Sequence, residues 1–164
     1  MDTKQYTTID KSQWARGPWD DEPDKMQWQD EQTGLPCLIV RGPSGALCGY
    51  VGVAEGHPCF GIDYDACKPV NAEDESESEW IEVHGGLTYS DFCQESEDEA
   101  KAVCHVPAPG EPKRIWWLGF DCAHAGDVSP KYDKDFALVG YGESYKTINY
   151  VRAQVQLLAR QLAI

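Results

Sequence analysis

The side chains best suited to chemistry follow an apolar stretch in the C-terminal half of the chain. Residues 115–120 are apolar or small, and the small-residue loop behind them carries Asp121, His124 and Asp127. A carboxylate beside an imidazole can orient it for proton transfer, and both groups are ligands of zinc and manganese. The competing interpretation is a loop in which these side chains only cap a turn and accept backbone N–H groups. Both interpretations stay open on the sequence alone.

Three of the four histidines, His57, His84 and His124, occur where an apolar segment meets glycine. Strand ends at the same edge of a compact sheet converge, so we expect these three imidazoles to lie around a common pocket. For His57 alone, a Gly-His-Pro turn that positions a loop is the favoured interpretation. His105 lacks the glycine setting and is left out of the predicted site.

The segment around His84 predicts a strand followed by an anion-binding loop. Residues 79–84 alternate apolar and polar side chains, which is typical of a strand. Behind them, the backbone N–H groups of Gly85 and Gly86 and the hydroxyl of Thr88 are available to an anion. Such a loop is a weak motif when it stands alone, so the prediction of anion binding depends on the neighbouring His84.

Trp116 and Trp117 are adjacent in sequence, so they face opposite sides of the predicted strand. Core packing is the favoured interpretation for both. If Trp117 lines a cleft instead, its flat ring next to the carboxylates and imidazoles would suit a nucleobase. Cys122 is close to His124 in sequence, but a buried, unreactive thiol is the favoured interpretation.

The predicted site therefore contains two groups of residues. Acid–base catalysis, or the binding of a divalent metal as cofactor, is assigned to His84, Asp121 and His124. Ligand binding is assigned to six further residues: His57, Gly85, Gly86, Thr88, Trp117 and Asp127.

A hairpin, a central strand and a helix are the elements that must position these residues. Two apolar runs flank Gly42-Pro43-Ser44-Gly45, which predicts a hairpin over 36–53, and 115–121 predicts a further strand. Residues 144–163 carry apolar side chains three and four apart, typical of an amphipathic helix with Ser144 as its N-cap. Strands that precede a packing helix predict an α+β fold, with a mainly antiparallel sheet and the C-terminal helix on one face.

The length and composition predict a single domain over 1–164. With 164 residues and 41% hydrophobic content, the chain can bury one core without disulfide bonds. Within this domain we expect an irregular arm held by tryptophans over 1–34, the sheet and its loops over 35–143, and the helix over 144–163.

Weaker patterns complete the interpretation. The segment 69–78 is acidic and lacks apolar periodicity, which indicates a solvated loop. Ser90 or Asp91 is suited to cap a short acidic helix that runs to about Val103, and 136–139 predicts a short strand or lid.

The net charge of −14 is concentrated in one part of the chain. Residues 71–101 hold eleven acids and one lysine, a net charge of −10. An acidic surface repels phosphate backbones, so general nucleic-acid binding is not expected, whereas a small phosphorylated ligand in a local pocket is compatible with this charge.

The cysteines and the N-terminus indicate the compartment. The seven cysteines include no C-x-x-C pair, and Met1 is followed by polar residues rather than by the apolar region of a signal peptide. We therefore expect the thiols to be mostly small buried hydrophobes in a cytoplasmic protein. No apolar run approaches the roughly 20 residues of a membrane-spanning helix, so no membrane partner is expected.

Several motifs together resemble a group of uncharacterised small proteins of tailed bacteriophages and prophages. The resemblance runs from about residue 22 to the C-terminus, with 71–78 as a variable insert. Its motifs are Gly56-His57-Pro58, Val83-His84-Gly85-Gly86-Leu87-Thr88 and Gly119-Phe120-Asp121-Cys122-Ala123-His124-Ala125-Gly126-Asp127. It implies a phage protein that acts on its host in the bacterial cytoplasm, and it supplies no catalytic residue.

Taken together, these features predict a phage counter-defence protein that recognises a small nucleotide-like immune signal. It would either sequester this signal or cleave it as a phosphodiesterase or other hydrolase. The alternative is an acidic protein–protein inhibitor, or nucleic-acid mimic, of a host or defence enzyme, which the charge of 71–101 favours. The apolar stripe of the C-terminal helix would serve a homo-oligomer as well as a core.

Overall fold

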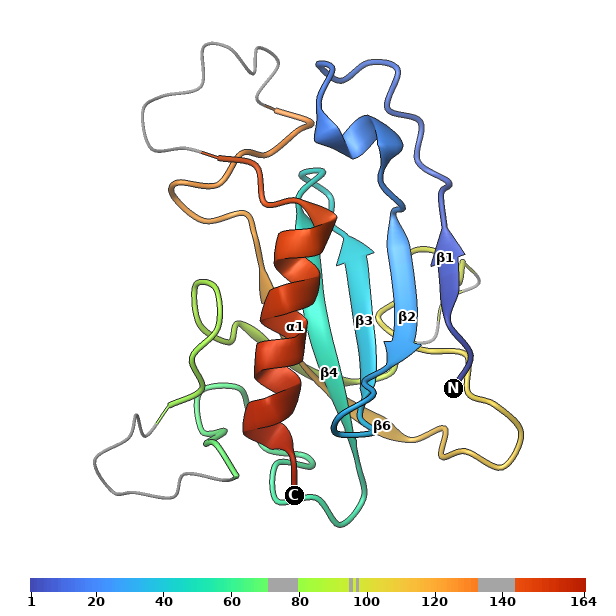
Figure 1. Ribbon diagram of the computed structural model, residues 1–164, viewed down its shortest axis with the longest axis vertical. Helices are drawn as coiled ribbons and strands as arrows, with labels where there is room; N and C mark the ends of the chain where they lie inside the picture. The colour runs from blue at the N-terminus through green and yellow to red at the C-terminus, as the bar shows by residue number, and fades with distance from the viewer. Residues whose placement is uncertain (71–79, 95, 97, 133–143) are drawn as a thin grey trace.

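Six strands form one antiparallel sheet, and a C-terminal helix packs on one of its faces (Figure 1). The computed structural model describes residues 1–70, 80–94, 96, 98–132 and 144–164. In sheet order the strands are β1 (Lys4–Tyr6), β2 (Lys25–Gln29), β3 (Pro36–Arg41), β4 (Leu47–Ala54), β6 (Ile115–Asp121) and β5 (Tyr89–Phe92). Helix α1 spans Ile148–Leu162 and lies across β3 and β4. The predicted α+β class is confirmed.

The predicted hairpin and central strand are both present. β3 pairs with β4 in antiparallel register, with Cys37 opposite Val51, and the turn between them uses Gly45 at φ +87°. β4 then pairs along its other edge with β6, the apolar strand that leads into the predicted site. β6 is thus enclosed between β4 and β5. β5 pairs with residues 116–119 of β6, and the C-terminal end of β6, Phe120 and Asp121, pairs with β4.

The larger part of the core lies between the sheet and α1. The helix buries a stripe of residues that includes Val151, Val155 and Leu158. Gly49 of β4 permits close approach here, because a Cβ atom at this position would lie 2.6 Å from Val155 Cγ2. The N-cap is Thr147, whose hydroxyl accepts the backbone N–H of Tyr150, so the helix starts after the predicted position 144. Burial of this stripe supplies most of the stability of an amphipathic helix.

The second face of the sheet is covered by the irregular segment 98–107. A smaller cluster lies beneath it and contains Leu38, Tyr50, Trp117 and Val103. The adjacent residue Trp116 belongs to the helix-side core instead, so the two tryptophans do face opposite sides of the sheet.

The N-terminal part is more regular than predicted. The expected irregular arm over 1–34 contains β1 and β2, and β2 is an internal strand paired with β1 and β3. Anchoring by aromatic side chains is observed: the Trp19 ring is fully buried and lies 5.0 Å from the Tyr145 ring. The arm prediction is wrong for β2 because Lys25 and Gln27 look solvent-exposed in the sequence but are buried.

Two further secondary-structure predictions are wrong. Residues 80–84 form no strand, because their backbone groups bond to side chains of α1 rather than to a neighbouring strand. The helix expected from Ser90 or Asp91 to Val103 is absent, because 89–92 pair with β6 as β5. Residues 71–78 of the predicted acidic loop 69–78 lie outside the described residues, and so does the predicted short strand or lid over 136–139.

Buried polar residues connect the N-terminal segment to the start of α1. The Arg41 guanidinium donates hydrogen bonds to Asp24 Oδ1 at 2.9 Å and to the Tyr145 hydroxyl at 2.8 Å. The Glu22 carboxylate accepts the backbone N–H of Ile148, the first helical residue, at 2.7 Å. An acceptor at this position satisfies a helix N–H group that has no partner within the helix.

The cysteines differ from the prediction in one respect. Cys93 and Cys104 form a disulfide bond, whereas Cys37, Cys48, Cys59, Cys67 and Cys122 are free. The expectation of buried hydrophobic thiols thus fits most of the free cysteines but not this pair, which links the end of β5 to the segment over the second face. No helix among the described residues combines the length and hydrophobicity that crossing a membrane requires.

Candidate functional site

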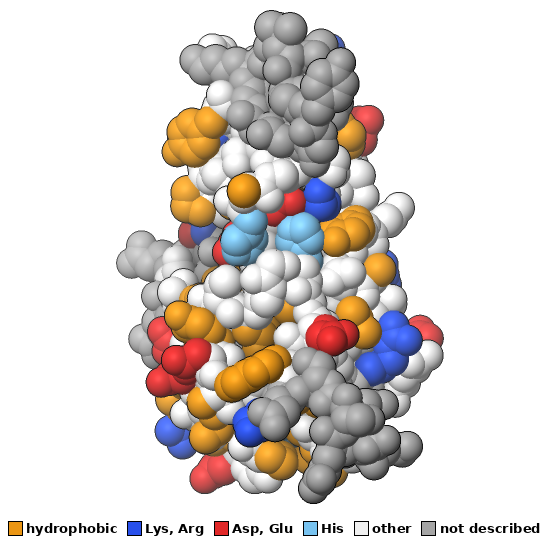
Figure 2. Space-filling model, turned by 90° about the vertical axis from the view of Figure 1, so that its left-hand side faces the viewer, with side chains coloured by type: hydrophobic (Ala, Val, Ile, Leu, Met, Phe, Trp, Pro, Cys, Tyr) orange, Lys and Arg blue, Asp and Glu red, His pale blue; other side chains and the backbone are white. Residues whose placement is uncertain are grey.

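His84, His124 and Asp127 lie together beside the N-terminal half of α1. His124 and Asp127 belong to the loop after β6, and hydrogen bonds from Val128 to Ser144 and from Ser144 to Gly126 join this loop to the start of the helix segment. Figure 2 shows two histidine side chains side by side on the surface, with acidic and basic side chains next to them. The cluster is therefore reachable from solvent.

The His84 ring is fixed at both nitrogens. Its Nε2 atom lies 2.9 Å from Asp127 Oδ2, and its Nδ1 atom lies 2.8 Å from the Tyr150 hydroxyl. Its backbone N–H also donates to Gln154 Oε1 at 2.9 Å, so α1 positions both the backbone and the ring. A histidine held in this way can serve as a metal ligand or as an acid–base group without reorientation.

Asp127 is the buried centre of the cluster, with only 2% of its side chain exposed. Besides His84, its carboxylate accepts the backbone N–H of His124 at 3.1 Å and lies 3.2 Å from Lys146 Nζ. Burial alone would raise the pKa of Asp127, but the hydrogen bonds from His84, His124 and Lys146 outweigh it and lower the pKa below its usual value. The carboxylate is therefore ionised at neutral pH.

His124 is the most exposed member, with 36% of its side chain accessible. Its Nδ1 atom is 3.3 Å from Asp121 Oδ1 and 3.9 Å from Asp127 Oδ2. Neither contact has hydrogen-bond geometry, so this buried nitrogen has no hydrogen-bond partner among the residues that the structure describes. Gly85 makes room for the ring, because a Cβ atom at that position would lie 2.6 Å from His124 Cε1.

The predicted anion-binding loop is not formed as expected. The N–H of Gly86 donates to the Val83 carbonyl at 2.8 Å, and the N–H of Thr88 donates to the Gly119 carbonyl at 2.9 Å. The Thr88 hydroxyl donates to Asp121 Oδ2 at 3.1 Å. These donors are used within the protein, so Thr88 supports the cluster through Asp121 rather than by binding an anion.

Two predicted ligand-binding residues lie elsewhere. His57 Nε2 is 2.7 Å from the Leu162 carbonyl, and its Nδ1 accepts the Cys59 N–H, so this ring fixes the C-terminal end of α1. That end is about 18 Å along the helix axis from Tyr150. Trp117 is fully buried under the other face of the sheet. The predicted pocket of three imidazoles with a tryptophan wall is therefore wrong, and two imidazoles meet instead.

The sequence prediction missed two residues of the cluster, Lys146 and Tyr150. Lys146 contacts the carboxylate at the centre, and the Tyr150 ring lies 5.5 Å from the His84 ring and is 36% exposed. Lys146 lies just before the N-cap of α1. Tyr150 lies on the polar side of the helix, where an aromatic residue was the available signal in the sequence.

The donor atoms have the spacing of a metal site. One ligand atom from each of His84, His124 and Asp127 lies within 4.8 Å of the other two. Ligands about 2.1 Å from a tetrahedral zinc ion lie about 3.4 Å apart. The observed separations of 2.9 Å and 3.9 Å about Asp127 Oδ2 are on either side of that value. Two imidazoles and a carboxylate with open positions form a common transition-metal ligand set.

The chain matches no known protein family, no curated protein and no solved structure. The cluster is therefore interpreted from its own geometry.

Proposed function

We propose that His84, His124 and Asp127 bind a divalent transition metal ion and, through it, a small anionic ligand of nucleotide-like type. The observation that carries this proposal is the convergence of three ligand-type atoms within 4.8 Å on a carboxylate that is 2% exposed. A buried, ionised carboxylate needs positive charge beside it. Lys146 supplies part of this charge, and a metal ion would supply more.

Tyr150 supports the metal interpretation because it can fix the tautomer of His84. If Nδ1 carries the hydrogen and donates it to the Tyr150 hydroxyl, the lone pair of Nε2 faces Asp127 and the proposed metal position. Ligating histidines commonly donate their second ring N–H to such a partner. In the competing arrangement without metal, Nε2 donates to Asp127 and the pair acts as an acid–base dyad.

The ligand we propose is small and phosphorylated. Lys146 and the open positions of the metal would contact phosphate oxygens, and the exposed Tyr150 ring offers an aromatic face for a base in place of the buried Trp117. The net charge of −14 argues against long nucleic acids.

If the ligand is cleaved, the proposed reaction is hydrolysis of a phosphate ester. A divalent ion held by His84, His124 and Asp127 would supply the Lewis acidity for this reaction. Asp121, which lies 3.3 Å from His124 Nδ1, would take a proton from the attacking water and return it to the leaving ester oxygen, while the bond from the water oxygen to phosphorus forms and the bond from phosphorus to the ester oxygen breaks. If the ligand is only held, the same contacts sequester it.

For the biological setting, we propose the counter-defence role that the resemblance to phage proteins implies. Two of the three motifs behind that resemblance, Val83–Thr88 and Gly119–Asp127, contain the residues of the cluster. The alternative of an acidic inhibitor depends on residues 71–101, of which 71–79, 95 and 97 lie outside the described residues. Loss of partner binding at high salt would support that alternative.

Metal analysis and calorimetry on protein purified without a histidine tag test the proposal. We expect the protein with its Cys93–Cys104 disulfide intact to bind one equivalent of zinc. His124→Ala or Asp127→Asn should weaken this binding by more than about 100-fold, because even outer partners of metal ligands cost 10–100-fold. Asp65→Asn, in an exposed loop, makes the same charge change and should bind zinc as the wild type does.

A panel of cyclic and linear nucleotides, followed by mass spectrometry and melting temperature, then separates cleavage from sequestration. Product formation that His84→Ala abolishes indicates an enzyme, whereas stabilisation without product indicates sequestration. Turnover without bound metal would assign the acid–base dyad instead. Absence of zinc binding together with no response to any nucleotide would refute the proposed function.

A further inference from the structure

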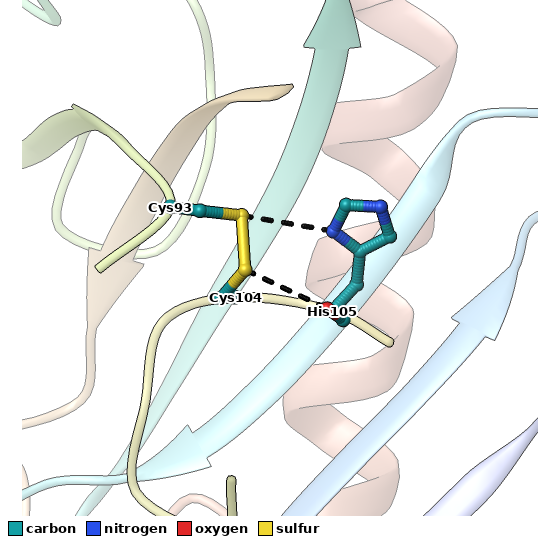
Figure 3. Close-up of side chains that lie close together, drawn as sticks. All are labelled: Cys93, Cys104 and His105. Atoms are coloured by element: carbon teal, nitrogen blue, oxygen red, sulfur yellow. Dashed lines mark hydrogen bonds between the residues drawn. A yellow bond between two sulfur atoms is a disulfide. The ribbon is translucent and has the colours of Figure 1, made fainter. Parts of the chain in front are cut away.

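The disulfide on the second face of the sheet has a histidine beside it (Figure 3). Cys93 directly follows β5, while Cys104 and His105 lie in the segment that returns over the sheet. His105 Nδ1 is 3.7 Å from Cys93 Sγ. The His105 side chain is buried, and both cysteines are partly accessible.

The surroundings of His105 direct a lone pair at the sulfur. Its Nε2 atom lies 3.3 Å from the carbonyl oxygen of Pro112, which can only accept a hydrogen bond. In the neutral ring Nε2 therefore carries the hydrogen, and the lone pair of Nδ1 faces Cys93 Sγ. This is the tautomer that a metal-ligating imidazole requires.

Trp117 contacts the same sulfur from within the sheet. Its indole N–H lies 3.3 Å from Cys93 Sγ and points at it as a donor. An N–H donor stabilises a thiolate more than a thiol, because it favours the charged form. Once the disulfide is opened, Cys93 thus has a donor that favours its thiolate.

Two buried side chains of β2 hold Cys104 and His105 in place independently of the disulfide. Lys25 Nζ donates to the carbonyls of Glu99, Ala102 and Cys104, the last two at 2.8 Å. Gln27 accepts the N–H of Val106 at 2.8 Å and donates to its carbonyl at 3.2 Å. None of these bonds involves a sulfur, so they do not depend on the disulfide. Cys93 is positioned separately, because it directly follows β5, which pairs with β6.

We propose that Cys93, Cys104 and His105 form a zinc site in the reduced protein. One donor atom from each of these residues lies within 4.8 Å of the others. Two thiolates and one imidazole leave one position of a tetrahedral zinc ion open. Cys104 and His105 line a cavity of about 570 Å³ together with Lys25 and Glu99, and this cavity gives a water or small ligand access to that position.

Formation of the site links metal binding to redox state. A dithiol reduces the disulfide: it transfers two electrons and two protons to the sulfurs and becomes a disulfide itself. When zinc binds, both thiols lose their protons, so two protons are released per ion. The oxidised protein has no thiolate at this position and does not bind zinc there. This site lies on the other face of the sheet from His84 and does not depend on the function proposed above.

Cobalt(II) tests the site because thiolate ligands give it a charge-transfer absorption band that imidazole and carboxylate ligands do not. Thiol titration of the denatured protein should count five thiols before treatment with dithiothreitol and seven after it. After removal of the dithiol, we expect the folded reduced protein to bind one equivalent of cobalt with the thiolate band, and the oxidised protein to show no band. This comparison requires no variant.

Variants assign the ligands. Cys104→Ser should abolish the band, and His105→Ala should weaken cobalt binding at least tenfold while the oxidised protein keeps its disulfide. The matched control is Cys67→Ser, because Cys59 and Cys67 are also close, with their sulfurs 2.9 Å apart, but both nitrogens of nearby His57 are already bonded. His124→Ala should leave the band unchanged. A reduced wild type without the band, or loss of the band in Cys67→Ser but not in Cys104→Ser, would overturn the proposal.

Discussion

Helix α1 covers one face of the sheet, whereas the irregular segment 98–107 covers the other. The helix buries a repeated apolar stripe, and its contacts with the sheet are those of side chains with side chains. The irregular segment is held by Lys25 and Gln27, which reach from β2 to its backbone groups, and by one disulfide. One cover thus depends on hydrophobic burial and the other on buried polar side chains that satisfy backbone acceptors.

A cavity under the helix should produce the largest loss of stability. Leu158 is fully buried against the sheet, so Leu158→Ala should lower the free energy of unfolding by about 2–5 kcal/mol. Leu157→Ala, on the partly exposed side of the same helix, should cost less than about 1 kcal/mol. Urea titration measures both, and equal losses in the two variants would contradict the assigned packing.

Removal of the Lys25 ammonium group, beneath the irregular segment on the second face, should lower the free energy of unfolding somewhat less. Lys25→Met leaves the carbonyls of Glu99, Ala102 and Cys104 without their donor, and we expect a loss of about 2–3 kcal/mol. Hydrogen exchange should show the loss locally, with faster exchange over 98–106 and little change in α1. Lys101→Met, at an exposed position, is the control. Uniformly faster exchange across the whole chain would mean that the two covers are not independent.

The smallest expected effect on stability is a pH dependence that comes from Asp24, at the junction between the N-terminal segment and the helix. Burial alone would raise the pKa of Asp24, but hydrogen bonds from Lys11, Arg41 and the backbone of Ile9 outweigh it and lower the pKa below the model-peptide value of 3.8. A carboxyl group whose pKa is lower in the folded state stabilises the protein above its unfolded pKa. This contribution is lost as the pH falls through the folded pKa.

Stability should therefore fall below about pH 4, by at most about 1.4 kcal/mol per pH unit for this group. Asp24→Asn should flatten the slope and, because it leaves Arg41 without its buried partner, destabilise the protein at pH 7. Asp63→Asn, in an exposed turn, should leave the slope as it is. An unchanged slope in Asp24→Asn would assign the acid sensitivity to other carboxylates.

The difference between the two covers also explains which parts of the fold the sequence could predict. The hairpin, β6 and α1 each have a local pattern of apolar residues, and each is present, although α1 starts at Ile148, later than predicted. β2 was missed because Lys25 and Gln27 are buried by partners 77 and 79 residues away in the sequence, which no local pattern records. The disulfide was missed because an odd number of cysteines without a paired motif carries no pairing information.

In the candidate site, too, the sequence predicted the local contacts and missed those that depend on distant residues. His124 and Asp127 are three residues apart and bonded to each other, so their association was visible in the sequence. The loop geometry that brings His84 to them depends on Gln154 and Tyr150 of the helix, and that arrangement is set only by the packing of α1. His57, like His84, occurs where an apolar segment meets glycine, but its ring contacts the Leu162 carbonyl at the C-terminal end of α1. The sequence around the two histidines does not distinguish these positions.

A substitution at Gly85 would disrupt the His84 cluster without removing any of its donor atoms. Its φ of +68° is strained for any residue with a side chain, and even a methyl group there would overlap the imidazole of His124. A single alanine would displace this ring without altering the chemistry of any ligand. Such a variant would serve as a control in metal-binding and nucleotide-binding measurements, with the same charge and almost the same mass as the native protein.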